Sequence, residues 1–438
     1  MLKSILYIII FIAFTSVGYS QEVWNLSKCV GYATENNIRL NQAYNMVASQ
    51  EVSYMESKTD VLPNLNLGSD VSLNFGRNID GNTNAVTFNQ TMGNSYWVQS
   101  SVNIFQGFVK YNSIAFNKFL LSAQKQNAES ERNILVFRIM TAYYTVLYSD
   151  GLARVAQNQV DLSDLQYNRM QKIVEVGKES PLTLQDLKSQ WAADKLSLTQ
   201  AKNNYNSTLL DLKQLLRINA HSEFVLDTLQ INPLVVNPSP KIDSVFDDAI
   251  TILPEIKQQE YLLNASEKDL AMAKGAISPR LTLSAGYGTS FYDGDSAAYN
   301  SQLTNNQNQW VNMSLVIPVF NGASTYSRIK QKQIALLNQQ LELEKQKDNL
   351  YTTIWKAIND VQSAQNEYES SVELYDFSKL NLQNITLKME KGLASVTDFQ
   401  AAKQRFVSAE AGLLKAKLVY MMRNQMLAFY KTGNWEHL

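Results

Sequence analysis

Residues of the types that most often carry out chemistry are few in this chain of 438 residues, and they are scattered. Cys29 is the only cysteine, and His221 and His437 are the only histidines. Neither histidine has a cluster of cysteines or carboxylates at metal-ligand spacing, and neither looks like a catalytic base. The sequence also has no glycine-rich phosphate loop. We therefore predict no bound metal, no cofactor and no enzymatic reaction.

Two serines lie in patterns that are typical of helix starts. Ser395 and Asp398 form an S-x-x-D motif, in which the Asp398 side chain would reach back to the helix N-terminus. In the first half of the chain, Ser180 precedes Pro181, as an N-cap precedes a proline at the first helical position. Both motifs can be explained by helix capping alone.

These helix starts belong to a segment that occurs twice. Gly177–Trp191 reads GKESPLTLQDLKSQW and Gly392–Phe406 reads GLASVTDFQAAKQRF. Gly, Ser, Gln and Lys are in register, and the same register aligns Gly107 with Gly322. A period of about 215 residues that is seen only twice predicts a duplicated domain rather than a solenoid.

The duplication divides the chain into four parts: a signal peptide (1–20), repeat 1 (21–217), a proline-containing linker (218–247) and repeat 2 (248–438). The first part has a lysine, a short apolar run and small residues before the cleavage site. The alternative, an N-terminal membrane anchor, would need about 20 apolar residues. Cys29 lies beyond the cleavage site, and we expect a buried structural thiol there rather than a lipid anchor.

Each repeat is predicted to contain one very long helix. No glycine or proline lies between Gly322 and Gly392, which favours a single helix of about 70 residues. Apolar or aromatic residues recur there at every seventh position, as in a coiled coil. Residues 108–176 should form the matching helix of repeat 1. A second helix follows each long one, over 182–216 and 397–430, so each repeat should form a helical hairpin.

Four segments alternate apolar with polar residues, as half-buried strands do. They are Asn64–Phe75, Tyr96–Ile104, Leu281–Tyr287 and Val311–Val319. Each is long enough to cross an outer membrane at a tilt, with its apolar face toward lipid and its polar face toward water. The connectors 76–95 and 293–309 are rich in polar residues and glycine, and we expect exposed loops there.

Aromatic residues cluster near the predicted strand ends. Trp97, Phe105, Trp310 and Phe320 are candidates for an aromatic girdle at the membrane interfaces. Packing of these rings against their own neighbours is the alternative.

Four strands cannot close a membrane barrel, because an open strand edge would leave backbone groups unsatisfied in lipid. Three chains would provide about twelve strands, enough for an open pore. Charge is nearly balanced, with 39 Lys and Arg against 40 Asp and Glu, and the basic residues are dispersed. A nucleic-acid partner is therefore not expected.

The chain resembles the TolC-like outer membrane efflux proteins over essentially the whole mature sequence. The resemblance rests on WNLSKCVGYATENN, on LPNLNL and SPRLTL before the first strand of each repeat, on the FQG and VFNG turns, and on the duplicated GKES and GLAS turns. It implies an α+β membrane protein of the bacterial outer membrane, with a periplasmic extension. Three chains would form a twelve-stranded β-barrel above a periplasmic α-helical barrel of coiled-coil hairpins.

The resemblance also implies a function and partners. The homotrimer would be the passive exit duct of a tripartite efflux or type I secretion system, with a periplasmic adaptor (membrane fusion) protein and an inner-membrane transporter. The turns at Gly177, Ser180, Gly392 and Ser395 would lie at the periplasmic tip and meet the adaptor.

Asp398 matches an aspartate that narrows the entrance in a well-known family member. Three such carboxylates around a pore would attract cations, although Asp398 also fits a capping role. Repeat 1 has Thr183 at this position, and Asp186 lies three residues further on. A second family aspartate is replaced by Ala401, so the locking contacts of that member do not transfer directly.

A periplasmic spacer protein without channel activity is the alternative function. In that case the apolar strand faces would need a protein partner instead of lipid. An enzyme is the weakest interpretation, and the sequence does not identify the exported cargo.

Overall fold

The computed structural model of the chain describes residues 23–79, 84–88, 90–222, 224–227 and 240–435. The predicted signal peptide lies outside the described residues. The chain packs into two units, and each takes segments from both sequence repeats. Unit 1 contains the described residues up to Ala43 together with 128–254 and 347–438, and unit 2 contains residues 44–127 and 255–346.

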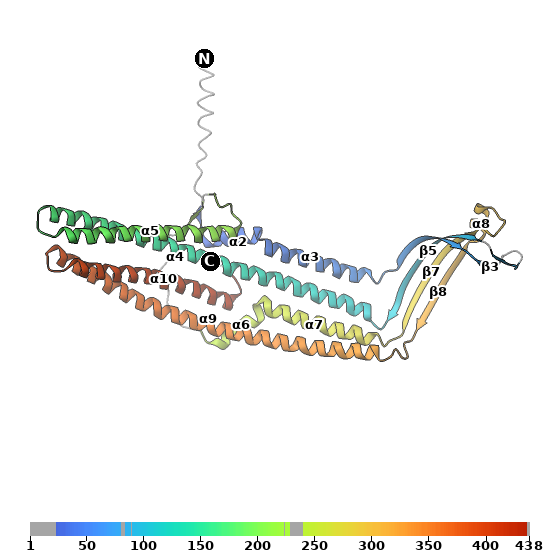
Figure 1. Ribbon diagram of the computed structural model, residues 1–438. Helices are drawn as coiled ribbons and strands as arrows, with labels where there is room; N and C mark the ends of the chain where they lie inside the picture. Colours follow the sequence, from blue (N-terminus) through green and yellow to red (C-terminus); the bar gives the residue numbers. More distant parts are fainter. Residues whose placement is uncertain (1–22, 80–83, 89, 223, 228–239, 436–438) are drawn as a thin grey trace, which may run out of the picture. The chain divides into compact units, whose positions relative to one another are not determined.

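Two long helices dominate the chain, and both were predicted from the sequence. They are α4 (Val109–Glu175) and α9 (Ser324–Glu390), each 67 residues long. Each is followed by a shorter helix, α5 (Pro181–Leu216) after α4 and α10 (Val396–Thr432) after α9. The predicted bounds agree with these helices to within two residues, because glycines and serine caps mark the ends. Figure 1 shows the two resulting hairpins.

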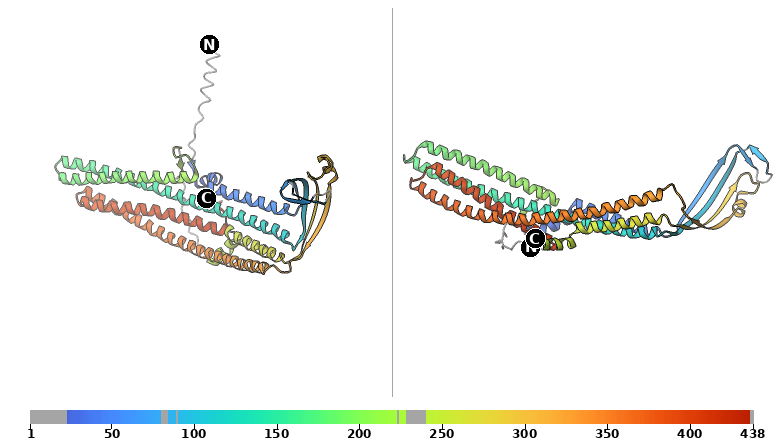
Figure 2. Two further views of the ribbon diagram at one scale, coloured as in Figure 1. Left: turned by 45° about the vertical axis from the view of Figure 1, so that its right-hand side comes forward. Right: turned by 90° about the horizontal axis from the view of Figure 1, so that it is seen from below.

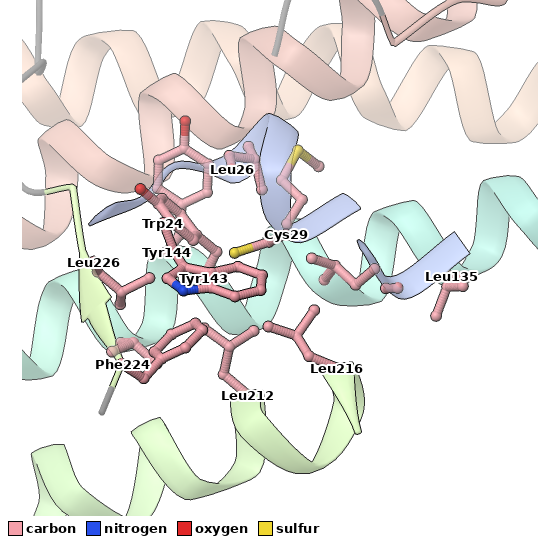
Figure 3. Close-up of a cluster of buried hydrophobic side chains, with 14 of the residues drawn as sticks. Trp24, Leu26, Cys29, Leu135, Tyr143, Tyr144, Leu212, Leu216, Phe224 and Leu226 are labelled. Carbon is pink, nitrogen blue, oxygen red and sulfur yellow. The ribbon is translucent and has the colours of Figure 1, made fainter. Parts of the chain in front are cut away.

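The core of unit 1 forms where residues 23–36 meet the α4–α5 hairpin. Strand β1 (Val23–Trp24) pairs in parallel with β6 (Val225–Leu226), and helix α2 (Leu26–Asn36) follows β1. Cys29 on α2 is fully buried among aromatic and leucine side chains (Figure 3). Burial raises the pKa of the Cys29 thiol to about 12, so the sulfur is an unreactive packing group, as predicted.

Three further helices lead into the sheet or extend the core. These are α3 (Ile38–Thr59), α6 (Ile242–Ile252) and α7 (Pro254–Gly275). Pro254 opens α7, as expected for a proline at the first helical position. Helix α6 begins inside the segment predicted as a linker. No helix among the described residues is long and apolar enough to cross a membrane.

Unit 2 contains a four-stranded antiparallel sheet. Its strands are β2 (Asn64–Asn74), β5 (Thr91–Gln106), β7 (Arg280–Tyr292) and β8 (Asn308–Val316), in the order β2-β5-β7-β8. All four were predicted. Strand β8 ends before Pro318, since proline cannot donate to a ladder. Figure 2 shows the strands side by side in two further views.

The two connectors at the far end of the sheet are more ordered than the sequence suggested. The first contains a small hairpin of β3 (Arg77–Ile79) and β4 (Val86–Phe88) and the start of β5. The second contains the short helix α8 (Tyr299–Asn305). The Gln302 side chain of α8 is buried and hydrogen-bonds backbone groups of Tyr292, Asp295 and Ala297. Loop composition alone could not reveal this closed set of hydrogen bonds.

Candidate functional site

The turns that close the two hairpins have the same backbone geometry. Gly177 and Gly392 both have positive φ, +74° and +70°. In each turn the glycine N–H donates to the carbonyl three residues back, and the next residue donates to the carbonyl five residues back. This is the Schellman arrangement, which favours glycine because its left-handed conformation strains other residues. Both turns lie at the same end of unit 1 (Figures 1 and 2).

The helix starts after the turns differ. The Ser180 hydroxyl accepts from the N–H of Leu182 at 3.1 Å, and Pro181 opens α5. Ser395 and Asp398 instead form a full capping box. The Asp398 N–H donates to Ser395 Oγ at 3.1 Å, and the Ser395 N–H donates to Asp398 Oδ2 at 3.0 Å. Hydrogen bonds from the side chain and backbone of Ser395 lower the pKa of Asp398.

The other predicted entrance residues make no such box. Thr183 is half-buried in the first turn of α5, and Asp186 is exposed on the next turn. Apolar side chains beside the two turns are also exposed: Leu182 is 73% exposed and Leu393 is 74% exposed. The ends of the hairpins therefore offer an ordered carboxylate at Asp398 and exposed apolar side chains that include Leu182 and Leu393.

A buried polar cluster lies further along the hairpins, and sequence reasoning missed it. Lys403 of α10 and Asp194 of α5 are 3% and 2% exposed, and their Nζ and Oδ2 atoms are 2.5 Å apart. Ser163 of α4 also donates to Oδ2, and the amides of Gln159 and Gln190 donate to Oδ1 at 2.7 and 2.9 Å. Burial lowers the pKa of Lys403, and the contact with Asp194 opposes this shift. The cluster ties both hairpins together through one satisfied carboxylate.

One sequence signal pointed toward this cluster. Lys403 is in register with Lys188 in the duplicated segment, yet Lys188 is exposed. Register alone shows that a lysine recurs, whereas its environment depends on which neighbouring helix packs against it.

The strand register sorts the sheet into two faces. Leu67, Val98 and Tyr287 lie on one face, and Asn66, Gln99 and Gly286 lie on the other. The alternation continues along all four strands, so one face is largely apolar and the other largely polar. Such a two-faced sheet is expected between lipid and water.

The tryptophans of the predicted girdle lie on the polar face. Trp97 pairs with Gly68 and its ring covers that glycine, while Trp310 pairs with Gly286 and covers it in the same way. The register therefore does not bring these two side chains to the apolar face, where a girdle would need them. The residues two positions away on either side of each tryptophan are polar, namely Ser95, Gln99, Asn308 and Asn312, so the sequence period of two already predicted the polar face.

Other aromatic residues do lie on the apolar face. Phe105 pairs with Leu281 at the helix-proximal end of the sheet. Phe320 lies beyond the end of β8, outside the strand register, and is 87% exposed. At the far end Tyr96 hydrogen-bonds Tyr299 through their hydroxyl groups at 2.9 Å, and the Tyr299 ring packs on Phe291. These far-end tyrosines were not among the residues predicted for the girdle.

The described residues contain no group of three or more His, Cys, Asp or Glu that could hold a metal ion.

We compared the chain with known protein families and solved structures. Residues 30–216 and 245–430 match the family described as "Outer membrane efflux protein". The chain belongs to the outer membrane efflux protein family. Both matched segments follow the duplication seen in the sequence.

Relatives and solved structures agree with this assignment. "Outer membrane protein TolC" of Escherichia coli (strain K12) is 21% identical over 437 residues, which cover 97% of this chain and 85% of that protein. A CusC structure matches with a TM-score of 0.81 and 16% identity, covering 95% of this chain and 96% of CusC. The Campylobacter jejuni CmeC outer membrane channel matches with a TM-score of 0.80 and 15% identity, covering 94% and 86%. At these identities the structures establish the fold of this outer membrane efflux protein.

Family membership also decides between the two functions left open by the sequence. A member of the outer membrane efflux protein family is an outer membrane channel for export, and nothing in the matches favours a spacer.

Proposed function

We propose that the protein is a passive, trimeric exit duct that carries cargo from the periplasm to the outside. The observation that supports this most strongly is the sheet, with one apolar face, one polar face and two open edges. Strands β2 and β8 each have a partner on one side only within the described sheet. Open edges in lipid cost several kcal/mol for each unsatisfied group, so another chain must cover them.

Three chains meet this requirement. Three chains of four strands each make a twelve-stranded barrel in which β8 of one chain pairs with β2 of the next. The polar faces then line a water-filled lumen, and the apolar faces meet lipid. A closed ring also explains why the described edge strands β2 and β8 contain no proline within their bounds.

The hairpin ends are the proposed docking site for a periplasmic adaptor protein, which links the duct to an inner-membrane transporter of a tripartite efflux or type I secretion system. The turns at Gly177–Ser180 and Gly392–Ser395 would make the contact. The exposed Leu182 and Leu393 support this role, because uncovered leucines at a helix turn favour burial against a partner. Energy would come from the transporter, since the duct itself needs no catalytic group.

Asp398 is the proposed carboxylate of the periplasmic entrance, with Thr183 and Asp186 as its counterparts in repeat 1. Its capping box with Ser395 does not exclude this role. The Oδ2 atom faces Ser395, and the residue stays exposed, so the charge remains available to passing ions.

Disulfide cross-linking tests the trimer. Asn66→Cys on β2 would be combined in turn with Asn308→Cys, Asn312→Cys and Ser314→Cys on β8, all on the polar face. Cys29 is buried and does not compete. We expect at least one pair to yield covalent dimers and trimers, with no larger species, after oxidation in membranes.

The matched control is Asn66→Cys with Gln99→Cys, which are paired neighbours within one chain. This pair should give an intrachain bond and migrate as a monomer. Ladders that extend beyond trimers, or no product joining chains from any β2–β8 pair, would contradict the proposed assembly.

A further inference from the structure

Each of the two strand pairs in the sheet has one tryptophan that lies on a glycine of the opposite strand. Trp97 of β5 is paired with Gly68 of β2, and Trp310 of β8 is paired with Gly286 of β7. A side-chain carbon at Gly68 would approach the Trp97 ring to 2.4 Å, and one at Gly286 would approach the Trp310 ring to 2.6 Å. Each ring therefore fits only where the opposite residue has no side chain.

The two strand pairs have the same register when it is counted from the proline before the first strand and the glycine after the second. The pairs that show this are Asn64–Ser101, one residue after Pro63 and six before Gly107, and Arg280–Val316, one after Pro279 and six before Gly322.

The tryptophan and its glycine are displaced together between the repeats. Gly68 lies five residues after its proline and Gly286 lies seven. Trp97 lies ten residues before the glycine that ends its repeat's strands, and Trp310 lies twelve. Because both partners are displaced by the same amount in the same direction along the sheet, they stay paired, which indicates that the ring and the glycine act as a unit.

The register of these strands needs such a unit, because alternation alone does not specify it. A slip by one residue turns every side chain to the other face and is excluded by the apolar pattern. A slip by two residues returns every side chain to its own face, so Leu67 and Val71 of β2 would keep theirs. A further contact must therefore select one register among those that differ by two.

Trp97 supplies that contact for β2. A slip by two would bring Asn66 or Asp70 opposite Trp97, and either side chain would occupy the space that the ring fills. The Trp97 Nε1–H also donates to Asp70 Oδ2 at 2.7 Å, which ties the ring to the next residue on the same face. The bond from the Ser101 N–H to Asn64 Oδ1 is less selective, since every residue of β5 offers an N–H.

Trp310 acts in one direction, and the connector acts in the other. A slip that brings Ser284 opposite Trp310 is blocked by the serine side chain, whereas Gly288 on the other side has none. That second slip would shorten the connector by two residues. The Thr289 hydroxyl donates to a carbonyl of α8 at 2.6 Å, and the Asn306 amide donates to a carbonyl of β7 at 2.8 Å, so the connector resists this change.

We infer that Trp97 with Gly68 and Asp70, and Trp310 with Gly286, position the edge strands β2 and β8 for pairing between chains. This inference rests on the proposed trimer. A slip by two residues displaces an edge strand by about 7 Å along its length. The stagger around a closed barrel is fixed by its strand number and strand tilt. A chain with a slipped edge therefore cannot complete the ring of twelve strands.

Disulfide yields within one chain measure the register of β2. The cysteine pairs are Asn66→Cys/Gln99→Cys for the observed register, and Ser72→Cys/Ser95→Cys and Ser72→Cys/Thr91→Cys for slips by two in the two directions. Each pair can bond only when its members lie opposite each other. We expect Trp97→Val, which favours a strand but removes the ring, to raise the ratio of slipped to observed yields at least about fivefold. The fraction of trimer in detergent should fall in parallel.

Three variants separate register from general stability. Phe105→Val makes a similar change on the apolar face of β5, outside the stretch paired with β2, and should leave the ratio unchanged. Trp97→Phe keeps a ring over the glycine and should keep the ratio close to that of the wild type. Gly68→Ser displaces the ring without removing it and should raise the ratio, yet it should add little when combined with Trp97→Val.

The possible outcomes are distinct. Equal ratios in the wild type, Trp97→Val and Gly68→Ser would overturn the inference and leave the duct intact. A raised ratio with an undiminished trimer fraction would also overturn it, because the slipped chains would then assemble. Gly68→Ser keeps the test decisive where Trp97→Val fails to fold. Absence of any β2–β8 cross-link between wild-type chains would contradict the trimer itself.

Discussion

The ends of the two helical hairpins share a backbone but differ in chemistry. Both turns use a left-handed glycine and a serine cap. Only the second adds an acidic residue to make a capping box, and only the second buries its register lysine. Duplication has therefore preserved the residues that fix the turn, while the exposed and buried polar groups have diverged. In the proposed trimer, a backbone with near-sixfold symmetry would carry threefold chemistry at its tip.

Removing the buried lysine should produce the largest effect. Lys403→Ala leaves Asp194 as an unpaired buried charge, and we expect a loss of about 3–5 kcal/mol in the free energy of unfolding. The register partner offers a matched control, because Lys188 is exposed and Lys188→Ala should change stability by less than about 0.5 kcal/mol. Chemical unfolding followed by far-UV circular dichroism measures both.

The double variant Lys403→Met/Asp194→Leu sharpens this test. It removes both charges and should recover much of the loss, since a buried apolar pair avoids the desolvation cost. Similar stability of the Lys188 and Lys403 single variants would show that the two repeats do not differ as described.

The turn glycines should behave alike. Gly177→Ala and Gly392→Ala each place a side chain at positive φ, and we expect each to cost about 1–2 kcal/mol. Space is not the cause, because a side-chain carbon would meet nothing within 4 Å at either position. Thermal unfolding measures the pair. Gly412→Ala in the interior of α10 is the control and should stabilise the protein by up to about 1 kcal/mol.

The serine caps should show a smaller difference between the repeats. Ser180→Ala and Ser395→Ala each remove an acceptor from a helix start, at a typical cost of about 1 kcal/mol. Ser395→Ala should cost more, because it also removes the hydroxyl that hydrogen-bonds Asp398. Thermal unfolding of both variants checks the order, and a larger effect at Ser180 would be inconsistent with the capping box.

The pH dependence of the capping box should be the smallest effect. Ser395 lowers the pKa of Asp398 in the folded state, so the stabilising contribution is present above the unfolded pKa. It is lost as pH falls through the lowered folded pKa. The melting temperature of wild type should therefore exceed that of Asp398→Asn at pH 7, and the difference should shrink as the pH falls through the lowered folded pKa of Asp398. A difference independent of pH would mean that the ionised carboxylate does not act as a cap.

The sequence was sufficient for most of the fold. A stretch without glycine or proline defined α9, and a stretch interrupted only by Gly151 defined α4, because few other residues interrupt a helix. Alternation of apolar and polar residues located the four strands. It also placed Trp97 among polar residues, which disagrees with the prediction of Trp97 as a girdle residue. Periodicity reports which residues share a face, and it requires only the sequence.

The polar cluster could not be predicted in this way. Asp194 and Lys403 are 209 positions apart, and their contact depends on how α5 and α10 pack. Lys188 occurs in the same local sequence pattern as Lys403, but its side chain is exposed rather than buried. The hydrogen bonds of Gln302 in the connector after β7 are a second example, because buried polar contacts depend on three-dimensional position rather than on composition.

Ion selectivity of the purified protein in planar bilayers tests directly whether the second repeat supplies the entrance chemistry. Wild type, Asp398→Ala and Thr183→Ala would be compared under a salt gradient. We predict that Asp398→Ala raises conductance or weakens cation preference, while Thr183→Ala changes neither. Unchanged current in Asp398→Ala with reduced thermal stability alone would show that the carboxylate is only a helix cap. Equal effects of the two substitutions would show that the repeats contribute alike.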